Sequence, residues 1–389
     1  MKRYMALKPK IIFFITEDWY FWSHRLPIAR AARDAGFEVL VITRVDQHKE
    51  LIENEGFKLV PIGLKRSSRN VIREALSVVE IIRIYRREKP DIVHQVAMKP
   101  VLYGSWAAIV SGIPNVVNAL AGLGFIFVAQ GWKASAFKRL VIFAYHLAFL
   151  VKNTIGIFQN PEDLELFVDA GVVKREKAAL IRGSGVDTSR FLHLPEPAGI
   201  ATIVLASRML WHKGIGEFVE AARQLHRDRV ICRFILVGTP DPENPASIPE
   251  EILCKWHSEG IVECWGYRED MPEVLSEAHL VTLPTTYGEG IPKILIEAAS
   301  CGRAIVATDV PGCREIVRHN ENGLLVPPHD SKSLADALKV LIKNPELRAK
   351  MGGRGREIVE AEFSEELVVK QTMEVYKKLN PRITQVGTD

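Results

Sequence analysis

The sequence predicts an α/β protein with two doubly wound domains, each built on a parallel sheet that helices cover on both faces. Three observations carry this prediction: short apolar runs alternate with helical segments, the alternation stops around residues 183–200, and it then restarts. Alternation of this kind needs crossover connections, which are typical of parallel sheets. The chain has 389 residues, 47% of them hydrophobic and 25% charged, which is enough for two or three domains.

The first domain is expected to begin on a buried strand. Residues 10–16 have a continuous apolar centre, as expected of a parallel strand that is covered on both faces. A helix follows at about 25–35 and ends at Gly36, where glycine suits a left-handed cap. The pattern then repeats, with helices near 47–55 and 69–88 and with strands near 37–43, 58–63, 91–97, 115–119, 154–159 and 179–182.

The most apolar helix is expected at 137–151. It is shorter than the ~20 apolar residues that cross a bilayer, and Lys138, Arg139 and Lys152 flank it. Two interpretations remain open: a buried crossover helix, or a helix that lies partly in a membrane interface. The strand expected after it favours the buried interpretation.

The alternation of strands and helices is interrupted between the two domains. Pro195, Pro197 and Gly199 indicate a linker, and the strand–helix pattern restarts at Ala201. The expected divisions of the chain are an N-terminal domain at 1–190, a linker at 191–200, a second domain at 201–365, and a C-terminal helix within 366–389 that packs back toward the first domain.

Two such domains joined by one linker create an interdomain cleft. Open α/β sheets bind ligands outside the carboxyl ends of their strands, so each loop after a strand is a candidate site. In the second domain, strands are expected near 201–207, 233–237, 261–265, 280–284 and 304–308.

Charge is unevenly distributed along the chain. Residues 1–190 hold 28 Lys and Arg against 18 Asp and Glu, a net charge of +10, and the remainder holds 23 against 29, a net charge of −6. A basic first half favours contact with nucleic acid or with an anionic membrane surface, although a chance bias on a solvated surface explains it equally well. The five cysteines form no C-x-x-C pair, which indicates reduced core thiols in a cytosolic protein.

The stretch 286–302 is predicted to be a loop that turns directly into a helix. Pro292 suits the first helical position, Gly290 lets the backbone approach a ligand, and the amides at the helix start favour an anion. Glu297 lies within an apolar helix body, where a carboxylate is costly without a partner. Glu289 lies eight residues earlier, in the loop. A phosphate site with two nearby carboxylates indicates a site for a sugar nucleotide.

A second group of candidates follows the first strand of the second domain. Arg208 and Lys213 flank a strand-to-helix turn, and a forked guanidinium beside a point-charge ammonium suits a diphosphate. Alone, charged loop residues are weak support, because most of them are solvated surface groups. They gain weight beside 286–302, since both loops are expected at the same end of one sheet.

Together these motifs resemble glycosyltransferase family four. The matching residues are Ser-Arg-x4-Lys-Gly at 207–214 and Glu-Gly-Ile-Pro-Lys-Ile-Leu-Ile-Glu at 289–297, an E-x7-E signature. Ser-His-Arg-Leu-Pro at 23–27 and Ala-Gly-Leu-Gly-Phe at 121–125 narrow the resemblance to the bacterial capsule and N-glycan assembly branch. The resemblance covers nearly the whole chain. It implies the GT-B fold, with two Rossmann-like domains facing a cleft, and transfer with retention of anomeric configuration.

The resemblance implies catalytic roles on the donor side. Arg208 and Lys213 should neutralise the donor diphosphate as it departs. Glu297 should hold the ribose hydroxyls, and Glu289 should face the donor sugar. The structural alternative for Glu297 is an ion pair with Lys293, four residues earlier, but that order of charges is the weaker one on a helix.

No metal and no other cofactor is expected. The reaction needs cations that stabilise charge on the departing diphosphate, and arginine and lysine can supply them. The sequence contains no Asp-x-Asp motif. The remaining donor-side residues should contact the sugar, the β-phosphate or the uracil: Gly290, Ile291, Tyr267 and Arg268.

The acceptor side departs from the family pattern. Many relatives carry a histidine in the loop after the fifth strand, but Ala121 occupies that place here. We expect His94, at the end of its strand, and His24, at the start of the first helix, to be the catalytic substitutes, with Asp18 orienting either one, although a lone histidine is often structural. The expected acceptor-binding residues are Asp18, His24, Arg25, Lys99, Gly122 and Gly124.

The sequence therefore predicts a retaining glycosyltransferase that moves an N-acetylhexosamine or hexose from a UDP-sugar to a polyprenyl-diphosphate-linked saccharide in bacterial surface polysaccharide or glycan assembly. Its basic first domain predicts a cytoplasmic protein on the inner face of the cell membrane, with an anionic membrane surface and no nucleic acid as partner. One alternative is an isomerase of the UDP-N-acetylglucosamine 2-epimerase type, which would need an acid–base cluster that we do not find. The other is a nucleotide-dependent binding protein without catalysis.

Overall fold

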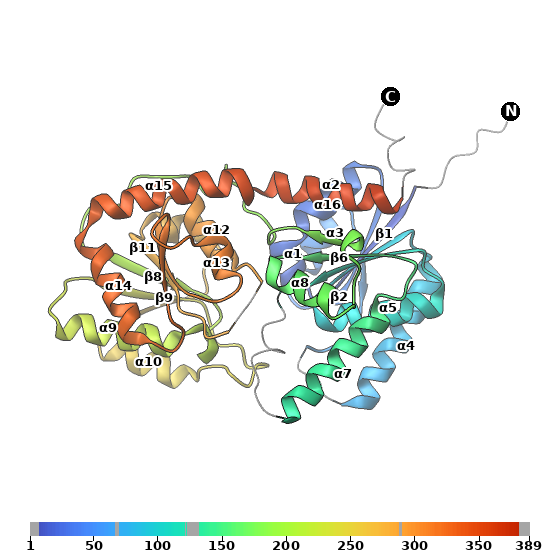
Figure 1. The fold of residues 1–389 in the computed structure, drawn as a ribbon, viewed down its shortest axis with the longest axis horizontal. Coiled ribbons are helices and arrows are strands. Elements are labelled where there is room, and N and C mark those ends of the chain that lie inside the picture. Colours follow the sequence, from blue (N-terminus) through green and yellow to red (C-terminus); the bar gives the residue numbers. More distant parts are fainter. Residues whose placement is uncertain (1–7, 67–69, 121, 123–131, 288–289, 381–389) are drawn as a thin grey trace. The chain divides into compact units, whose positions relative to one another are not determined.

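The computed structural model describes residues 8–66, 70–120, 122, 132–287 and 290–380, without the side chains of 132–137. Over this part, the chain forms two compact units (Figure 1). The first contains Met1–Ser184 together with Leu367–Asp389, and the second contains Gly185–Glu366. Each unit is one parallel sheet with helices on both faces, so the predicted doubly wound α/β fold class is confirmed.

The first unit is built on a seven-stranded sheet with the order β3-β2-β1-β4-β5-β6-β7. The first strand of the chain is apolar on both faces, because its neighbouring residues, such as Ile12 and Phe13, enter different core clusters. The strands are β1 (Lys10–Glu17), β2 (Glu38–Arg44), β3 (Lys58–Pro61), β4 (Ile92–Val96), β5 (Asn115–Leu120), β6 (Asn153–Phe158) and β7 (Ala178–Leu180).

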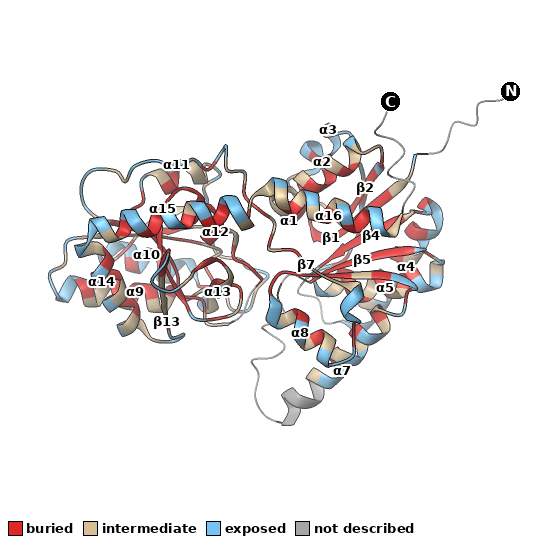
Figure 2. Cartoon of the chain, turned by 45° about the horizontal axis from the view of Figure 1, so that its top comes forward, coloured by how far each residue is buried: buried red, intermediate tan, exposed pale blue. Residues whose placement is uncertain are grey.

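The helices of the first unit are α1 (Asp18–His24), α2 (Leu26–Asp34), α3 (Lys49–Asn54), α4 (Val71–Glu88), α5 (Met98–Ser111), α7 (Trp132–Ala148), α8 (Pro161–Asp169) and α16 (Glu365–Leu379). One face of the sheet packs against α2, α3 and α16, and the other packs against α4 and α5. Figure 2 shows that the strands are mostly buried, whereas the outward faces of the helices are exposed. The last helix of the chain thus completes the core of the first unit.

The apolar helix expected at 137–151 is α7, and it is amphipathic. Val141, Tyr145 and Ala148 pack into a core cluster, whereas Leu140 and Phe143 are exposed. One face of α7 is therefore buried, as expected of a crossover helix, and the other exposes apolar side chains, as expected of a helix in a membrane interface. No helix in the described part of the chain is both long and apolar enough to cross a membrane.

The second unit has a six-stranded parallel sheet with the order β10-β9-β8-β11-β12-β13. Its strands are β8 (Thr202–Ala206), β9 (Arg233–Val237), β10 (Glu263–Gly266), β11 (Leu280–Leu283), β12 (Ala304–Thr308) and β13 (Gly323–Val326). Its helices are α9 (Ile215–Arg227), α10 (Glu250–Ser258), α11 (Met271–Ser276), α12 (Lys293–Ser300), α13 (Cys313–Ile316), α14 (Ser331–Lys343) and α15 (Pro345–Glu362). Two core clusters cover its two faces.

The boundary between the units lies earlier than the sequence indicated. Residues 185–190, expected in the first domain, belong to the second unit, and so does the expected linker 191–200. Val186 and Phe191 are buried in its core, and Ser300 Oγ donates to the Phe191 carbonyl at 2.8 Å. The error has a physical cause: single apolar residues in a loop have no periodicity from which burial can be inferred.

One glycine of α15 packs so closely on the turn after α12 that it has no room for a side chain. A Cβ at Gly352 would lie 1.9 Å from the Gly302 carbonyl oxygen, whereas a Cβ at Gly353 would meet nothing within 4 Å. Gly352→Ala should therefore lower the free energy of unfolding by about 2 kcal/mol or more. Gly353→Ala is the matched control and should raise it by about 0.5–1 kcal/mol. Equilibrium urea unfolding measures both, and equal effects would contradict this description of the packing.

Candidate active site

The candidate donor site lies at the edge of the second sheet that is formed by the carboxyl ends of its strands. β8 and β11 are hydrogen-bonded neighbours, so the loops that follow them leave the same edge. Gly214, just before α9, has a φ of +77°, and a Cβ there would lie 2.0 Å from the Pro284 carbonyl oxygen. The absence of a side chain at Gly214 lets the two loops touch, which brings Lys213 beside the loop that precedes α12.

Hydrogen bonds hold these two loops together. The Thr286 backbone N–H donates to the His212 carbonyl at 2.9 Å, and the Thr285 hydroxyl donates to the same oxygen at 3.1 Å. From the end of β12, the Thr308 hydroxyl donates to the Thr285 carbonyl at 2.6 Å. The rings of His212 and Tyr287 also lie 4.6 Å apart. The loops therefore form one preorganised body, as electrostatic stabilisation of a departing group requires.

Arg208 is fixed by an acid that the sequence did not single out. Its Nη1 lies 2.5 Å from Asp241 Oδ2, and the Asp241 backbone N–H donates to Ser247 Oγ at 2.9 Å. Asp241 belongs to the loop after β9, next to β8 in the sheet. Lys213 is half-buried at the end of the short helix η2 (Trp211–Lys213). Two cationic residues thus follow one strand, and Asp241 holds the orientation of Arg208.

Glu297 is buried in α12, with an exposed fraction of 7%. Burial raises its pKa, and the opposing charges of Lys293 and Arg190 only partly offset this. Lys293 Nζ lies 3.5 Å from Glu297 Oε1, so the structural alternative considered for this residue is present as a contact. Pro292 caps the helix and is not its first residue, which corrects the predicted start.

Arg190 is a second residue that sequence reasoning missed. It lies in a turn in which the Asp187 side chain accepts from the backbone N–H groups of Ser189 and Arg190 at 2.9 and 3.1 Å. Arg356 of α15 holds that turn through the carbonyl groups of Thr188 and Phe191. The charge of Arg190 acts on Glu297 by lowering its pKa, against the larger effect of burial. An Asp followed two residues later by Ser, the pattern of an Asx turn, is the signal that could have indicated the turn.

Tyr267 and Arg268 follow β10, so they lie at the carboxyl end of the strands of the same sheet. Tyr267 is 67% exposed, so its ring is open to stacking. Arg268 donates to Asp270 Oδ1 at 2.6 Å and lies over the Trp265 ring, with the guanidinium 5.7 Å from the ring centroid. The charge of Arg268 is therefore compensated within its own loop.

Parts of the predicted site lie outside the described residues. They are Glu289 in the donor loop, and Ala121 and Gly124 in the loop after β5. Gly290 and Ile291 are described, and the Ile291 side chain is buried in the core beneath α12.

In the first unit, Asp18 does not orient either candidate histidine. Its carboxylate accepts from the backbone N–H groups of Trp19, Asp46 and His48 at 2.7–3.0 Å, which ties α1 to the loop after β2. His24 instead stacks on Tyr20, with ring centroids 4.2 Å apart. The expected role of Asp18 is wrong because its oxygens already accept backbone hydrogen bonds.

His94 lies in the interior of the sheet. It is the third of the five residues of β4, not at the strand end as expected, and it is 1% exposed. Its Nδ1 lies 2.5 Å from the hydroxyl of Tyr376, which α16 supplies. The sequence could not show this burial, because the covering helix lies 282 residues away.

Lys99 and Gly122 lie on different elements of the first unit. Lys99 Nζ pairs with Glu74 Oε1 at 2.9 Å and donates to the Lys65 carbonyl at 2.8 Å, so α4 and its preceding loop hold it. Gly122 follows β5 with a φ of +91°, a conformation that glycine adopts readily. Across the described residues, no group of three or more His, Cys, Asp or Glu side chains is arranged to hold a metal ion.

The buried carboxylate of Glu297 should make the stability of the ligand-free protein depend on pH. Its pKa is raised above the usual 4.5, so stability is lost as the pH rises from about 4.5 through the raised value. Glu297→Gln carries no charge, so at pH 7 its Tm should exceed that of the unaltered protein, and the two should converge below about pH 4.5. Calorimetry between pH 4 and 8 measures this, with Glu374→Gln on an exposed part of α16 as the control. A lower Tm for Glu297→Gln at pH 7 would mean that the ion pair with Lys293 outweighs the cost of burial.

Two family models match the chain. A model described as Glycosyl transferase 4-like matches residues 10–155, in the first unit. A model described as Glycosyl transferases group 1 matches residues 201–344, in the second. The resemblance inferred from the motifs is therefore confirmed.

Several curated proteins are similar over most of their length. N,N'-diacetylbacillosaminyl-diphospho-undecaprenol alpha-1,3-N-acetylgalactosaminyltransferase from Campylobacter jejuni is 27% identical over 371 residues, which cover 92% of this chain and 96% of the relative. The capsular polysaccharide biosynthesis glycosyltransferase CapM from Staphylococcus aureus is 22% identical over 91% of this chain and 94% of its own. UDP-Gal:alpha-D-GlcNAc-diphosphoundecaprenol alpha-1,3-galactosyltransferase from Escherichia coli is 25% identical, with 69% of this chain and 70% of that protein covered.

Solved structures agree on the fold. A glycosyltransferase from Rickettsia africae matches with a TM-score of 0.76 at 17% identity, over 96% of this chain and 99% of that one. Anabaena HepE in complex with UDP-glucose matches with a TM-score of 0.74 at 20% identity, over 96% and 99%. From these matches and the two family models, the chain belongs to the GT-B glycosyltransferases, with a Glycosyl transferase 4-like domain followed by a group 1 domain.

Proposed function

We propose that this glycosyltransferase moves an N-acetylhexosamine or hexose from a UDP-sugar to a polyprenyl-diphosphate-linked saccharide during the assembly of bacterial surface glycans. The names of two relatives include an undecaprenyl-diphosphate-linked acceptor, and one of these names also includes a UDP-sugar donor. The capsular polysaccharide relative supports the same setting.

One observation carries the donor half of the proposal. Arg208, held by Asp241, and Lys213 leave the same sheet edge as the loop that leads into α12 and Glu297. A UDP-sugar needs cations for its diphosphate and an acceptor for its ribose hydroxyls, and this edge supplies both. Arg190 adds a third positive charge near Glu297.

The reaction needs charge stabilisation more than acid–base groups. As the anomeric C–O bond breaks, negative charge grows on the diphosphate, and Arg208 and Lys213 stabilise it without a metal ion. The acceptor hydroxyl forms the new bond on the face that the diphosphate leaves, and its proton passes to the departing phosphate oxygen. This route retains the anomeric configuration and needs no histidine on the acceptor side. It suits a chain in which Ala121 stands where many relatives have histidine.

The epimerase alternative is not favoured. The relatives named above are transferases, and the same class of domain matches both halves of the chain. Incubation with a UDP-sugar in the absence of acceptor separates the two activities, because only an epimerase converts the sugar under those conditions.

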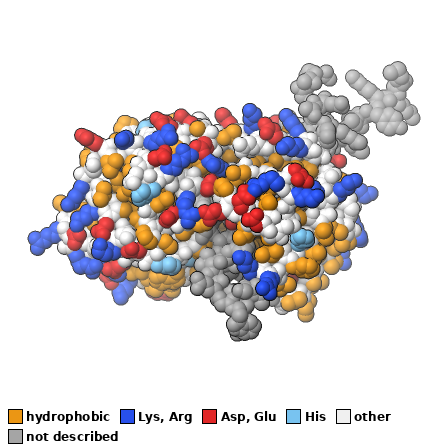
Figure 3. Space-filling model, viewed as in Figure 1, with side chains coloured by type: hydrophobic (Ala, Val, Ile, Leu, Met, Phe, Trp, Pro, Cys, Tyr) orange, Lys and Arg blue, Asp and Glu red, His pale blue; other side chains and the backbone are white. Residues whose placement is uncertain are grey.

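We further propose that α4 docks the first unit on an anionic membrane. Figure 3 shows hydrophobic side chains gathered on the part of the first unit where α4 lies. The exposed Ile72, Leu76 and Val79 recur at helical spacing on α4, and the exposed Arg83 and Arg86 continue the same stripe. An apolar stripe that ends in arginines suits the interface of an anionic leaflet.

Loss of either central donor-side residue should reduce transfer strongly. Lys213→Ala and Glu297→Ala should each lower kcat/KM by roughly 10²–10³, the scale for loss of one transition-state contact. Acceptor-dependent release of UDP measures the rate, and Lys350→Ala, a lysine exposed on α15, should retain full activity. Near-normal rates for Lys213→Ala or Glu297→Ala would refute the donor assignment. The assay contains a chelator, so full dependence on added Mg²⁺ or Mn²⁺ would instead refute the metal-free mechanism.

Membrane docking should depend on both salt and the apolar stripe. Co-sedimentation should show binding to phosphatidylglycerol vesicles at low ionic strength, and release when salt is raised or the vesicles are made of phosphatidylcholine. Leu76→Ser with Val79→Ser should weaken binding, whereas Ile231→Ser, at an even more exposed apolar residue of the second unit, should not. Binding that ignores salt would point to α7 as a hydrophobic anchor.

A further inference from the structure

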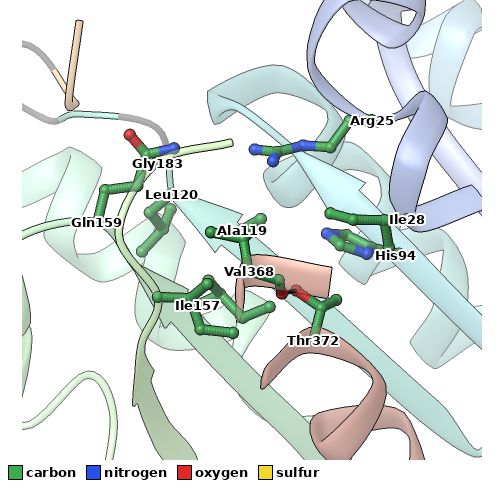
Figure 4. A pocket seen from close by; sticks show the side chains of 11 residues that line it. Arg25, Ile28, His94, Ala119, Leu120, Ile157, Gln159, Gly183, Val368 and Thr372 are labelled. Atoms are coloured by element: carbon green, nitrogen blue, oxygen red, sulfur yellow. Dashed lines mark hydrogen bonds between the residues drawn. The ribbon is translucent and has the colours of Figure 1, made fainter. Parts of the chain in front are cut away.

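A small cavity lies inside the first unit, between the sheet and α16 (Figure 4). Its volume of about 10 Å³ is room for one water-sized group. β4 contributes His94, the start of α2 contributes Ile28 with Arg25 just before it, and α16 contributes Val368 and Thr372. Figure 4 shows the Arg25 guanidinium reaching toward Gln159 and Gly183, across the cavity from α2.

Two buried nitrogen atoms at this cavity have no hydrogen-bond partner among the described residues. They are Arg25 Nε and His94 Nε2, in side chains that belong to residues 4% and 1% exposed. A buried donor without a partner is costly, and such groups are rare in folded proteins. Both atoms belong to residues that line the same cavity.

The Tyr376 hydroxyl contacts one ring nitrogen of His94, Nδ1, at 2.5 Å. Burial raises the pKa of Tyr376 well above its usual value, so the hydroxyl keeps its proton. Burial, and then the charge of Arg25, lowers the pKa of His94 well below its usual value, which favours the neutral ring. A protonated hydroxyl can donate to Nδ1, and in that tautomer the ring proton lies on Nε2. In this tautomer the cavity faces two N–H donors.

The positive charge of Arg25 is compensated only weakly by the contacts that it makes. Its Nη1 donates to the His24 carbonyl at 3.4 Å, and the guanidinium lies 6.0 Å from the centroid of the Tyr20 ring. In the described part of the chain, Arg25 forms no ion pair, and no acid lines the cavity. At the β1–α1 junction, Glu17 Oε2 pairs with Arg44 at 3.1 Å, and the Asp18 carboxylate accepts from backbone N–H groups. A buried guanidinium without a counterion is expensive unless a ligand supplies the charge.

We propose that Arg25 and His94 bind one oxygen of a phosphate group, which belongs to the diphosphate of the lipid-linked acceptor. The cavity has room for one oxygen, so the rest of the group lies outside it. Arg25 supplies the charge and His94 supplies a directional N–H, while Tyr376 is a positioning residue that fixes the His94 proton. The assignment to the acceptor rests on the proposed function, whereas the phosphate site does not.

Binding to diphosphates tests the site without any turnover. With UDP present to occupy the proposed donor site, inorganic diphosphate and farnesyl diphosphate, at ionic strength fixed with chloride, should each raise the Tm of the unaltered protein and bind in calorimetry. Arg25→Met should weaken both at least tenfold, yet its ligand-free Tm should equal or exceed that of the unaltered protein, because an uncompensated charge is gone. Arg30→Met, an exposed arginine of α2 that pairs with Glu55, is the matched control and should bind normally.

The histidine and the tyrosine test the directional donor. His94→Phe should weaken diphosphate binding, and Tyr376→Phe should weaken it less. Tyr376→Phe is the milder change and serves as the test if His94→Phe does not fold. Equal stabilisation of the unaltered protein and Arg25→Met, or no response to either diphosphate, would overturn the proposal. Binding of inorganic but not farnesyl diphosphate would overturn the acceptor assignment alone. The Tm response to UDP-sugars is measured in parallel, because its absence would sink the proposed function and leave the phosphate site standing.

Discussion

The pairing of β8 with β11 is the constraint on which the donor chemistry depends. Neighbouring parallel strands deliver their loops to one edge, and the contact at Gly214 lets those loops touch. The His212 carbonyl then receives hydrogen bonds from the loop of the other strand. Cations from one loop and the carboxylate beyond the other are therefore held in place before any ligand arrives, which is what stabilisation of a departing diphosphate needs.

Each unit buries a charged side chain that its own residues compensate poorly. Glu297 in the second unit has a lysine contact at 3.5 Å, and burial still raises its pKa. Arg25 in the first unit has no ion pair in the described part of the chain. The two charges are opposite in sign. A carboxylate suits the hydroxyl groups proposed to bind at Glu297, and a guanidinium suits the phosphate proposed to bind at Arg25. Both lower the stability of the ligand-free protein, which is characteristic of residues retained for binding.

The C-terminal helix packs into the same core as the first strand of the chain. α16 leaves the second unit and covers one face of the first sheet, and its Tyr376 meets His94 across 282 residues. This helix lines the cavity with Val368 and Thr372 and supplies the hydroxyl that contacts the histidine. The properties of the proposed phosphate site therefore depend on the last helix of the chain as much as on the loop after β1.

The sequence alone determined the doubly wound fold class and the glycosyltransferase family, and it predicted a donor site at Arg208, Lys213 and Glu297, because apolar periodicity and short motifs are local. It did not identify Asp241, 33 residues from the arginine that it holds, or Arg190, whose turn is fixed by a helix far along the chain. It placed His94 at a strand end, although the structure buries it within β4. Ion pairs, burial and proton positions depend on which distant segments pack together, and only the tertiary structure decides that.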